Sequence, residues 1–151
     1  MLRKLFLGAC IGGLLMGQVF ESPQEQQART DKLILNLQSP DQKTRKIAEY
    51  KLLKVAKSKS RSKPQEAEVL IKQILASNPN SADAHMRLAE IKLKRWSVNK
   101  NTSDKAAGMN HLRQAKRLYK QKDDEFTVQK LENIETQVNR GSASYNWVFP
   151  K

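Results

Sequence analysis

The chain has 151 residues, and its 28 lysines and arginines against 15 aspartates and glutamates give a net charge of +13. This length suits a single domain with a modest core. The one cysteine rules out an intramolecular disulfide and a cysteine-based metal site, and the two histidines are too few for a histidine-rich metal centre. The composition therefore argues against thiol enzymes and metalloenzymes.

Residues 1–20 form a separate segment with a basic start and an apolar body. Arg3 and Lys4 precede the run 5–20, in which Gln18 is the polar exception. This order is that of a secretory signal, although as a helix the run would extend roughly 24 Å, short of a bilayer core of roughly 30 Å. The sequence therefore predicts an exported, periplasmic or extracytoplasmic protein, with residues 1–20 either cleaved as a signal peptide or kept as a membrane anchor.

Cys10 closes a short motif within this segment. Leu7-Gly8-Ala9-Cys10 resembles the lipobox of bacterial lipoproteins, in which the cysteine is lipidated and becomes the new N-terminus. The resemblance implies that Cys10 is a lipidation site. The alternative interpretation is that Cys10 is one more apolar residue of the run.

Residues 21–140 have the pattern of a helical domain. Alternating β-branched runs and Asn-Gly or Asp-Gly turns are missing, whereas helix-start signals recur at short intervals. These signals are Ser39-Pro40-Asp41-Gln42, Ser62-Lys63-Pro64-Gln65, Ser81-Ala82-Asp83, Ser103-Asp104 and Asp123-Asp124-Glu125. Arg140-Gly141 is typical of a helix end. The sequence thus predicts six helices and an all-α fold, in which antiparallel helical hairpins stack as a short α-solenoid or form a small bundle.

The helix expected after Ser81 differs from the others because it is apolar on two sides. Its apolar residues are Ala84, Leu88 and Ile91 on one side and Met86 and Leu93 on the other. A helix with two apolar sides is covered on both. We therefore expect this helix in the middle of the stack.

The stretch from Gln65 to Arg95 resembles a tetratricopeptide repeat. Ala67, Ile71 and Pro79 match the small residue, the bulky residue four positions later and the proline that end one repeat. Leu88-Ala89 matches the pair that opens the next repeat, and the small–large–small order recurs at Gly108, Leu112 and Ala115. The chain departs from the pattern at Lys92, where the family has a tyrosine, and at residues 96–105, which add about seven residues to a repeat of roughly 34.

This resemblance implies a tetratricopeptide-like α-solenoid that acts as a non-catalytic scaffold. Proteins of this family hold an extended peptide or a partner helix in the groove of the stack. On the helix expected after Ser81, the resemblance implies four partner-binding residues, which are Met86, Arg87, Glu90 and Lys94.

Positive charge is concentrated in residues 41–63, which carry nine basic and two acidic side chains. The segment ends in an alternating series of cations, Lys57, Lys59, Arg61 and Lys63, separated by serines. Because this series lacks apolar residues, we predict a solvated loop that binds a polyanion such as anionic lipid. Aromatic residues for base stacking are not interleaved with the cations, which disfavours nucleic acid.

No catalytic constellation accompanies these features. His85 and His111 are expected on apolar helix faces, without an acid or thiol at a spacing typical of catalysis, and we interpret both as packing residues. Phosphate-binding glycine loops and paired carboxylates at a defined spacing are also missing from the sequence. We therefore predict a protein that is not an enzyme and uses no cofactor.

Residues 141–151 form an aromatic tail, in which Tyr145, Trp147 and Phe149 follow a Gly-Ser-Ala-Ser stretch. Such a tail either caps the last hairpin or anchors a partner. The complete sequence favours a protein-binding adapter or assembly factor in a membrane-associated complex, with the three aromatic residues as partner anchors. The alternative is a basic helical protein that binds a polyanion, either anionic lipid or organellar RNA.

Overall fold

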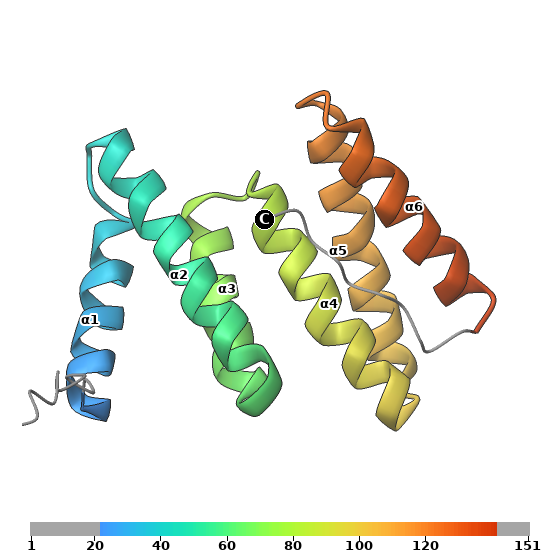
Figure 1. The fold of residues 1–151 in the computed structure, drawn as a ribbon, viewed down its shortest axis with the longest axis horizontal. Helices are drawn as coiled ribbons and strands as arrows, with labels where there is room; N and C mark the ends of the chain where they lie inside the picture. Colours follow the sequence, from blue (N-terminus) through green and yellow to red (C-terminus); the bar gives the residue numbers. More distant parts are fainter. Residues whose placement is uncertain (1–21, 142–151) are drawn as a thin grey trace, which may run out of the picture.

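The computed structural model describes residues 22–141, and this part of the chain folds into six α-helices. In chain order they are α1 (Pro23–Asn36), α2 (Gln42–Ser62), α3 (Pro64–Ser77), α4 (Ala82–Asn99), α5 (Thr102–Lys120) and α6 (Glu125–Asn139). The helices follow one another from one end of the molecule to the other, and each packs against the next (Figure 1). The predicted all-α stack of antiparallel hairpins is confirmed.

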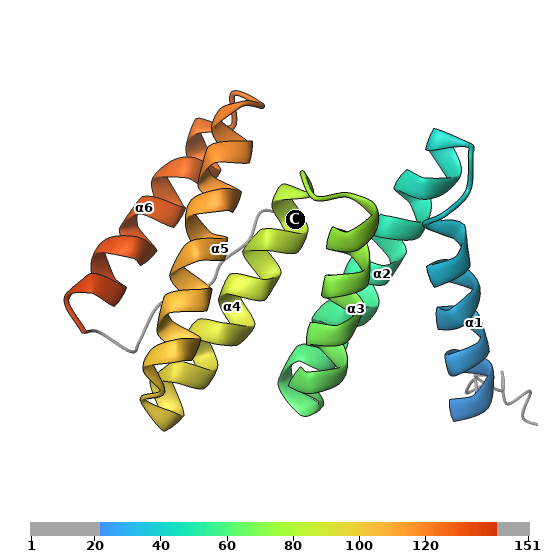
Figure 2. The ribbon, with the colours of Figure 1, turned by 180° about the vertical axis from the view of Figure 1, so that it is seen from behind.

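The two central hairpins, α2–α3 and α4–α5, form two layers. Helices α2 and α4 lie toward the viewer in Figure 1, and α3 and α5 lie toward the viewer from the opposite side in Figure 2. Contact between α2 and α4 joins the hairpins on the first face. This α2–α4 face carries the candidate site.

Several helix starts are one or two residues away from the predicted ones. Asp41, rather than Ser39, caps α2 by accepting hydrogen bonds from the backbone of Lys43 and Thr44. Asn101, rather than Ser103, caps α5. The predicted caps of α4 at Ser81 and of α6 in the acidic cluster at Asp124 are confirmed.

The expected loop over residues 57–63 is wrong, because α2 continues to Ser62 and α3 begins two residues later. The hydroxyl groups of Ser58 and Ser60 donate to backbone carbonyls three residues earlier, which keeps both serines compatible with a helix. Basic residues are good helix formers, and near a helix C-terminus they also complement the dipole. A helix end that faces solvent can therefore alternate cations and serines without containing any apolar residue.

Two apolar cores lie on either side of α4. The first is shared by α1 to α4 and includes Leu52, Ile71 and Ile74. The second is shared by α4, α5 and α6 and includes Leu112 and Leu131. Helix α4 contributes Ala84, Leu88 and Ile91 to the first core and Met86, Ala89, Leu93 and Trp96 to the second. The prediction that this helix is covered on two sides is confirmed.

The hairpin α4–α5 packs closely because Gly108 leaves room for Leu93. A Cβ atom at position 108 would lie 2.7 Å from Leu93 Cγ and 3.2 Å from the Leu93 backbone nitrogen. Residues 96–105, which exceed the common repeat length, extend both helices of this hairpin rather than forming a long loop. Trp96 is buried in the extension, with the amino groups of Lys100 and Lys105 over its ring.

Residues 1–21 and 142–151 are outside the described part of the chain. The predictions for the signal or anchor segment, for Cys10 and for the aromatic anchors Tyr145, Trp147 and Phe149 therefore stay predictions. In residues 22–141, none of the helices has the length and apolar character needed to cross a membrane.

Candidate partner-binding groove

A groove of about 430 Å³ lies on the α2–α4 face, where the junction of α2 and α3 meets the second half of α4. It is lined by Ser60, Arg61, Pro64, Gln65, Glu90, Ile91, Lys94, Arg95 and Val98. The groove brings together Glu90 and Lys94, expected to bind a partner, and Arg61, expected to bind a polyanion. These residues are about thirty positions apart in the sequence and meet because α2 and α4 lie side by side.

The charges on α4 beside the groove are partly neutralised by a local series of ion pairs. Glu90, whose side chain is 9% exposed, lies 3.0 Å from the guanidinium of Arg87 and also pairs with Lys94. Its carboxylate is thus occupied, and it fixes the positions of both cations. Arg61 forms no ion pair with a described residue, so its charge is available to a ligand.

Apolar surface completes the groove. Val98 is 85% exposed although it is a large aliphatic residue on a regular helix, and Pro64 and the edge of Ile91 lie nearby. The aliphatic stems of Arg61 and Lys94 add to this surface, because long basic side chains bury their methylene groups and keep the charge in water. The groove therefore offers apolar contact together with positive charge.

Met86 does not belong to this groove, and the prediction that it contacts a partner is wrong. Its side chain is 2% exposed and lies in the second core with Leu112 and Leu131. The reason is the two-sided character of α4: Met86 is on the side that α5 and α6 cover. Arg87, Glu90 and Lys94 lie outside that core and are joined by ion pairs, with Lys94 exposed, Arg87 half-buried and Glu90 buried.

The predicted polyanion site divides into two pairs of residues. Lys59 and Lys63 both contact the carboxylate of Glu66, and their hydrogen bonds are the main cause that lowers the pKa of Glu66. Lys57 and Arg61 are exposed and form no ion pair within residues 22–141. The cations of this segment therefore do not act as one cluster.

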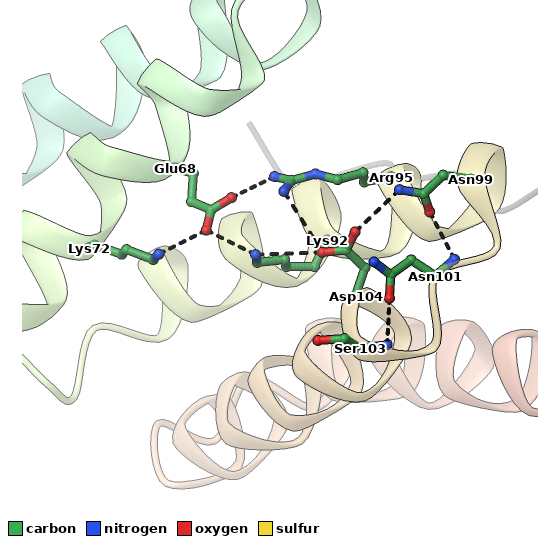
Figure 3. Close-up of polar contacts among 8 residues, drawn as sticks. All are labelled: Glu68, Lys72, Lys92, Arg95, Asn99, Asn101, Ser103 and Asp104. Atoms are coloured by element: carbon green, nitrogen blue, oxygen red, sulfur yellow. Dashed lines mark hydrogen bonds and ion pairs between the residues drawn. The ribbon is translucent and has the colours of Figure 1, made fainter.

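A buried charge network lies beside the groove and was not predicted from the sequence (Figure 3). Glu68 of α3 binds Lys72 and Lys92, with nitrogen–oxygen distances of 2.9 Å, and also Arg95. Lys92 reaches on to Asp104 of α5 at 3.5 Å. Lys92, the departure from the tetratricopeptide pattern, thus links α3, α4 and α5, as does Arg95, which lies 3.8 Å from Asp104.

Burial and hydrogen bonding act in opposite directions on the pKa of Glu68. Burial alone would raise it, but hydrogen bonds from Lys72, Lys92 and Arg95 outweigh burial and lower the pKa to about 2. The carboxylate is therefore charged at every physiological pH. Because Arg95 also lines the groove, the network holds one wall of the groove in place.

His85 and His111 pair across the α4–α5 interface. Their Nδ1 atoms are 3.0 Å apart, and His85 Nε2 lies 3.0 Å from the carbonyl oxygen of Pro79. Because a carbonyl can only accept, His85 Nε2 carries a hydrogen, and Nδ1 of neutral His85 accepts one from His111 Nδ1. The two side chains thus connect α5 to the start of α4.

We expect His111 to titrate with a pKa of about 4. Burial lowers its pKa most, and the neighbouring charges of His85 and Lys92 lower it further. Since the folded pKa lies below the unfolded value of 6.5, the protein loses stability as pH falls from about 6.5 to 4. An NMR titration of the imidazole resonances measures this value, and a pKa near 6.5 would contradict the burial of the His111 side chain.

Comparisons with models of protein families, with curated proteins and with solved structures give no match for this chain. The fold and the groove are therefore the basis for a functional assignment. Helical spacing predicts that Glu90 and Lys94 share one side of α4, whereas the contribution of Pro64 and Val98 to the groove depends on how the hairpins stack.

Proposed function

We propose that this protein is a non-catalytic adapter or assembly factor that binds a partner protein in the α2–α4 groove. The observation that carries the proposal is the groove itself, a concave site between two helical hairpins with exposed apolar surface at Val98 and an available cation at Arg61. The resemblance of residues 65–95 to a tetratricopeptide repeat supports it, since that family binds peptides or helices between its hairpins.

The chemistry of the groove favours a partner segment that is apolar with acidic residues at its edge. Arg61, Lys94 and Arg95 line the groove against one carboxylate, Glu90, which is already paired. A partner carboxylate would meet the guanidinium of Arg61, and an aliphatic or aromatic side chain would cover Val98. Such contacts bury apolar area and add a charge-assisted hydrogen bond.

The membrane-associated setting of the proposal is supported by the N-terminal sequence. A basic start followed by the apolar run 5–20 favours export, and export would place the domain in an extracytoplasmic compartment. If the run is retained, it tethers the adapter beside the membrane.

The proposal predicts that a partner is lost when the groove is altered and kept when an exposed apolar residue outside the groove is altered. We expect Val98→Asp to abolish capture of the partner in a crosslinked pull-down from solubilised membranes, because it places a charge on apolar contact surface. Val69→Asp is the matched control, since Val69 is 55% exposed on α3, away from the groove. A partner held by apolar contacts also survives a high-salt wash, because salt screens charge but not apolar burial.

Two outcomes would contradict this function. Equal loss of the partner in both variants would place the binding surface elsewhere. If only lipid or nucleic acid were recovered, and all of it were released by salt, the function of the protein would be electrostatic binding of a polyanion.

A further inference from the structure

Helix α2 carries a straight row of exposed side chains that the groove does not use. The row, called the basic stripe below, consists of Lys43, Lys46, Ile47, Tyr50, Lys54, Lys57 and Arg61. These positions are i, i+3, i+4, i+7, i+11, i+14 and i+18, so they share one side of the helix. That side is opposite the buried row Ala48, Leu52 and Ala56. The stripe therefore faces solvent along a helix roughly 30 Å long.

The five charged residues of the basic stripe are all cations, and no acid neutralises them. The two acidic residues nearest in sequence are engaged elsewhere: Asp41 caps α2, and Glu49 accepts hydrogen bonds from Asn78 and Ser81. Within residues 22–141, none of the five cations takes part in an ion pair. The stripe is thus a continuous line of uncompensated positive charge.

Apolar groups lie between these cations. Ile47 is 44% exposed and Tyr50 is 58% exposed, and together with Gln42, Lys43 and Lys46 they line a shallow hollow. The amino group of Lys54 lies 4.5 Å from the centre of the Tyr50 ring. A tyrosine and an aliphatic residue between lysines suit the headgroup layer of a bilayer. There the apolar side chains can enter the boundary of the acyl chains while the lysines stay in water beside the charged headgroups.

The start of α1 and the last turns of α2 border one pocket. Pro23 lines this pocket from α1, and Ser58 and Ser62 line it from α2, so the start of α1 and the last turns of α2 lie on opposite sides of the pocket. Ser22 is thus at the same end of the α1–α2 hairpin as Lys57 and Arg61 of the stripe (Figure 1). The apolar run 5–20 ends two residues before Ser22, and a membrane-held run would keep this end of α2 near the bilayer.

We propose that the basic stripe binds the surface of an anionic phospholipid bilayer, with Ile47 and Tyr50 in the headgroup layer. A planar anionic surface fits a straight row of cations better than nucleic acid does, because single-stranded nucleic acid is bound by successive stacking aromatics and the stripe has one aromatic residue. The inference is independent of the partner groove, which shares only Arg61 with the stripe.

The test compares vesicle binding of the full chain and of two variants with equal loss of charge. The stripe variant is Lys43→Gln, Lys46→Gln, Lys54→Gln and Lys57→Gln. The control variant replaces four exposed cations of the α5–α6 hairpin, Arg117→Gln, Lys120→Gln, Lys122→Gln and Arg140→Gln. Glutamine favours helix about as well as lysine and arginine do, and Lys122 and Arg140 are exposed outside the helices. We therefore expect both variants to keep the fold, which circular dichroism verifies.

Partition is measured on phosphatidylcholine vesicles with and without phosphatidylglycerol, in physiological salt. The run 5–20 contributes equally in every protein. The informative quantity is therefore the partition coefficient on vesicles with phosphatidylglycerol divided by that on vesicles without it. Each cation near an anionic surface contributes roughly fivefold to partition, and we expect the ratio to fall by about 100-fold or more in the stripe variant. In the control variant we expect a change below about threefold, because its substituted cations do not face the bilayer.

Three results would overturn the inference. An equal fall in both variants would mean that net charge alone attracts the protein to lipid. An unchanged ratio in the stripe variant would show that α2 does not face the bilayer. Binding of a single-stranded RNA that depends on the stripe, without any preference for anionic vesicles, would assign the stripe to nucleic acid.

Discussion

Replacing Gly108 by valine is expected to lower the free energy of unfolding by about 3 kcal/mol. The new Cβ would lie 2.7 Å and 2.8 Å from Cγ and Cδ2 of Leu93, which is fully buried and cannot move into solvent. The valine methyl groups would enlarge the clash and separate α4 from α5. Thermal or urea unfolding monitored by circular dichroism measures the change.

Ala106→Val is the matched control on the same helix, since Ala106 is exposed and its change alters helix propensity by only about 0.5 kcal/mol. Gly108→Ala should fall between the two, because alanine adds the clashing Cβ but gains about 1 kcal/mol of helix propensity. If the valine variants at 106 and 108 were equally stable, the close approach of α4 and α5 described here would be wrong.

Replacing Glu68 by glutamine is expected to lower the free energy of unfolding by about 2 kcal/mol at neutral pH. In acid this difference between the two proteins should disappear. The pKa of Glu68 falls from 4.5 to about 2 in the folded protein, against the effect of burial, because Lys72, Lys92 and Arg95 bind its charged form. A lowered acid pKa gives stability that is fully present above pH 4.5 and is lost as pH falls toward 2. The free energies of unfolding of the wild type and of Glu68→Gln should therefore become nearly equal near pH 2.

Urea unfolding of both proteins at a series of pH values provides this comparison. Glu66→Gln is the control on the same helix: Glu66 also pairs with two lysines, but it is exposed, so solvent screens the interaction and its loss should matter much less. A difference between wild type and Glu68→Gln that did not depend on pH would contradict the network in Figure 3.

The helical fold could be predicted because its signals are local. Proline and acidic helix starts, together with apolar spacing, indicate six helices, and the two-sided pattern of α4 places it in the middle of the stack. The loop predicted over residues 57–63 was wrong because solvent-facing helix turns need no apolar residue. There, serine hydroxyls bond to the helix backbone and Lys59 pairs with Glu66 across the α2–α3 junction.

The site could be predicted only in part because it depends on which helices become neighbours. Helical spacing places Glu90 and Lys94 on one side of α4, but it cannot show that Met86 is covered by α5 and α6. Nor does the sequence show that Lys92 joins Glu68 and Asp104, which are 24 and 12 positions away along the chain.

The central claim, that a partner protein binds between α2–α3 and α4, is tested most directly by site-specific photocrosslinking. A photoreactive amino acid is placed at Val98 in the groove and, in a second protein, at Val69 on α3, both being exposed positions that tolerate a larger side chain. The adapter function predicts one defined protein adduct from position 98 and none of that mass from position 69. Identical adducts from both positions would contradict it. So would the lack of any protein adduct from position 98 in the cells that naturally produce this protein.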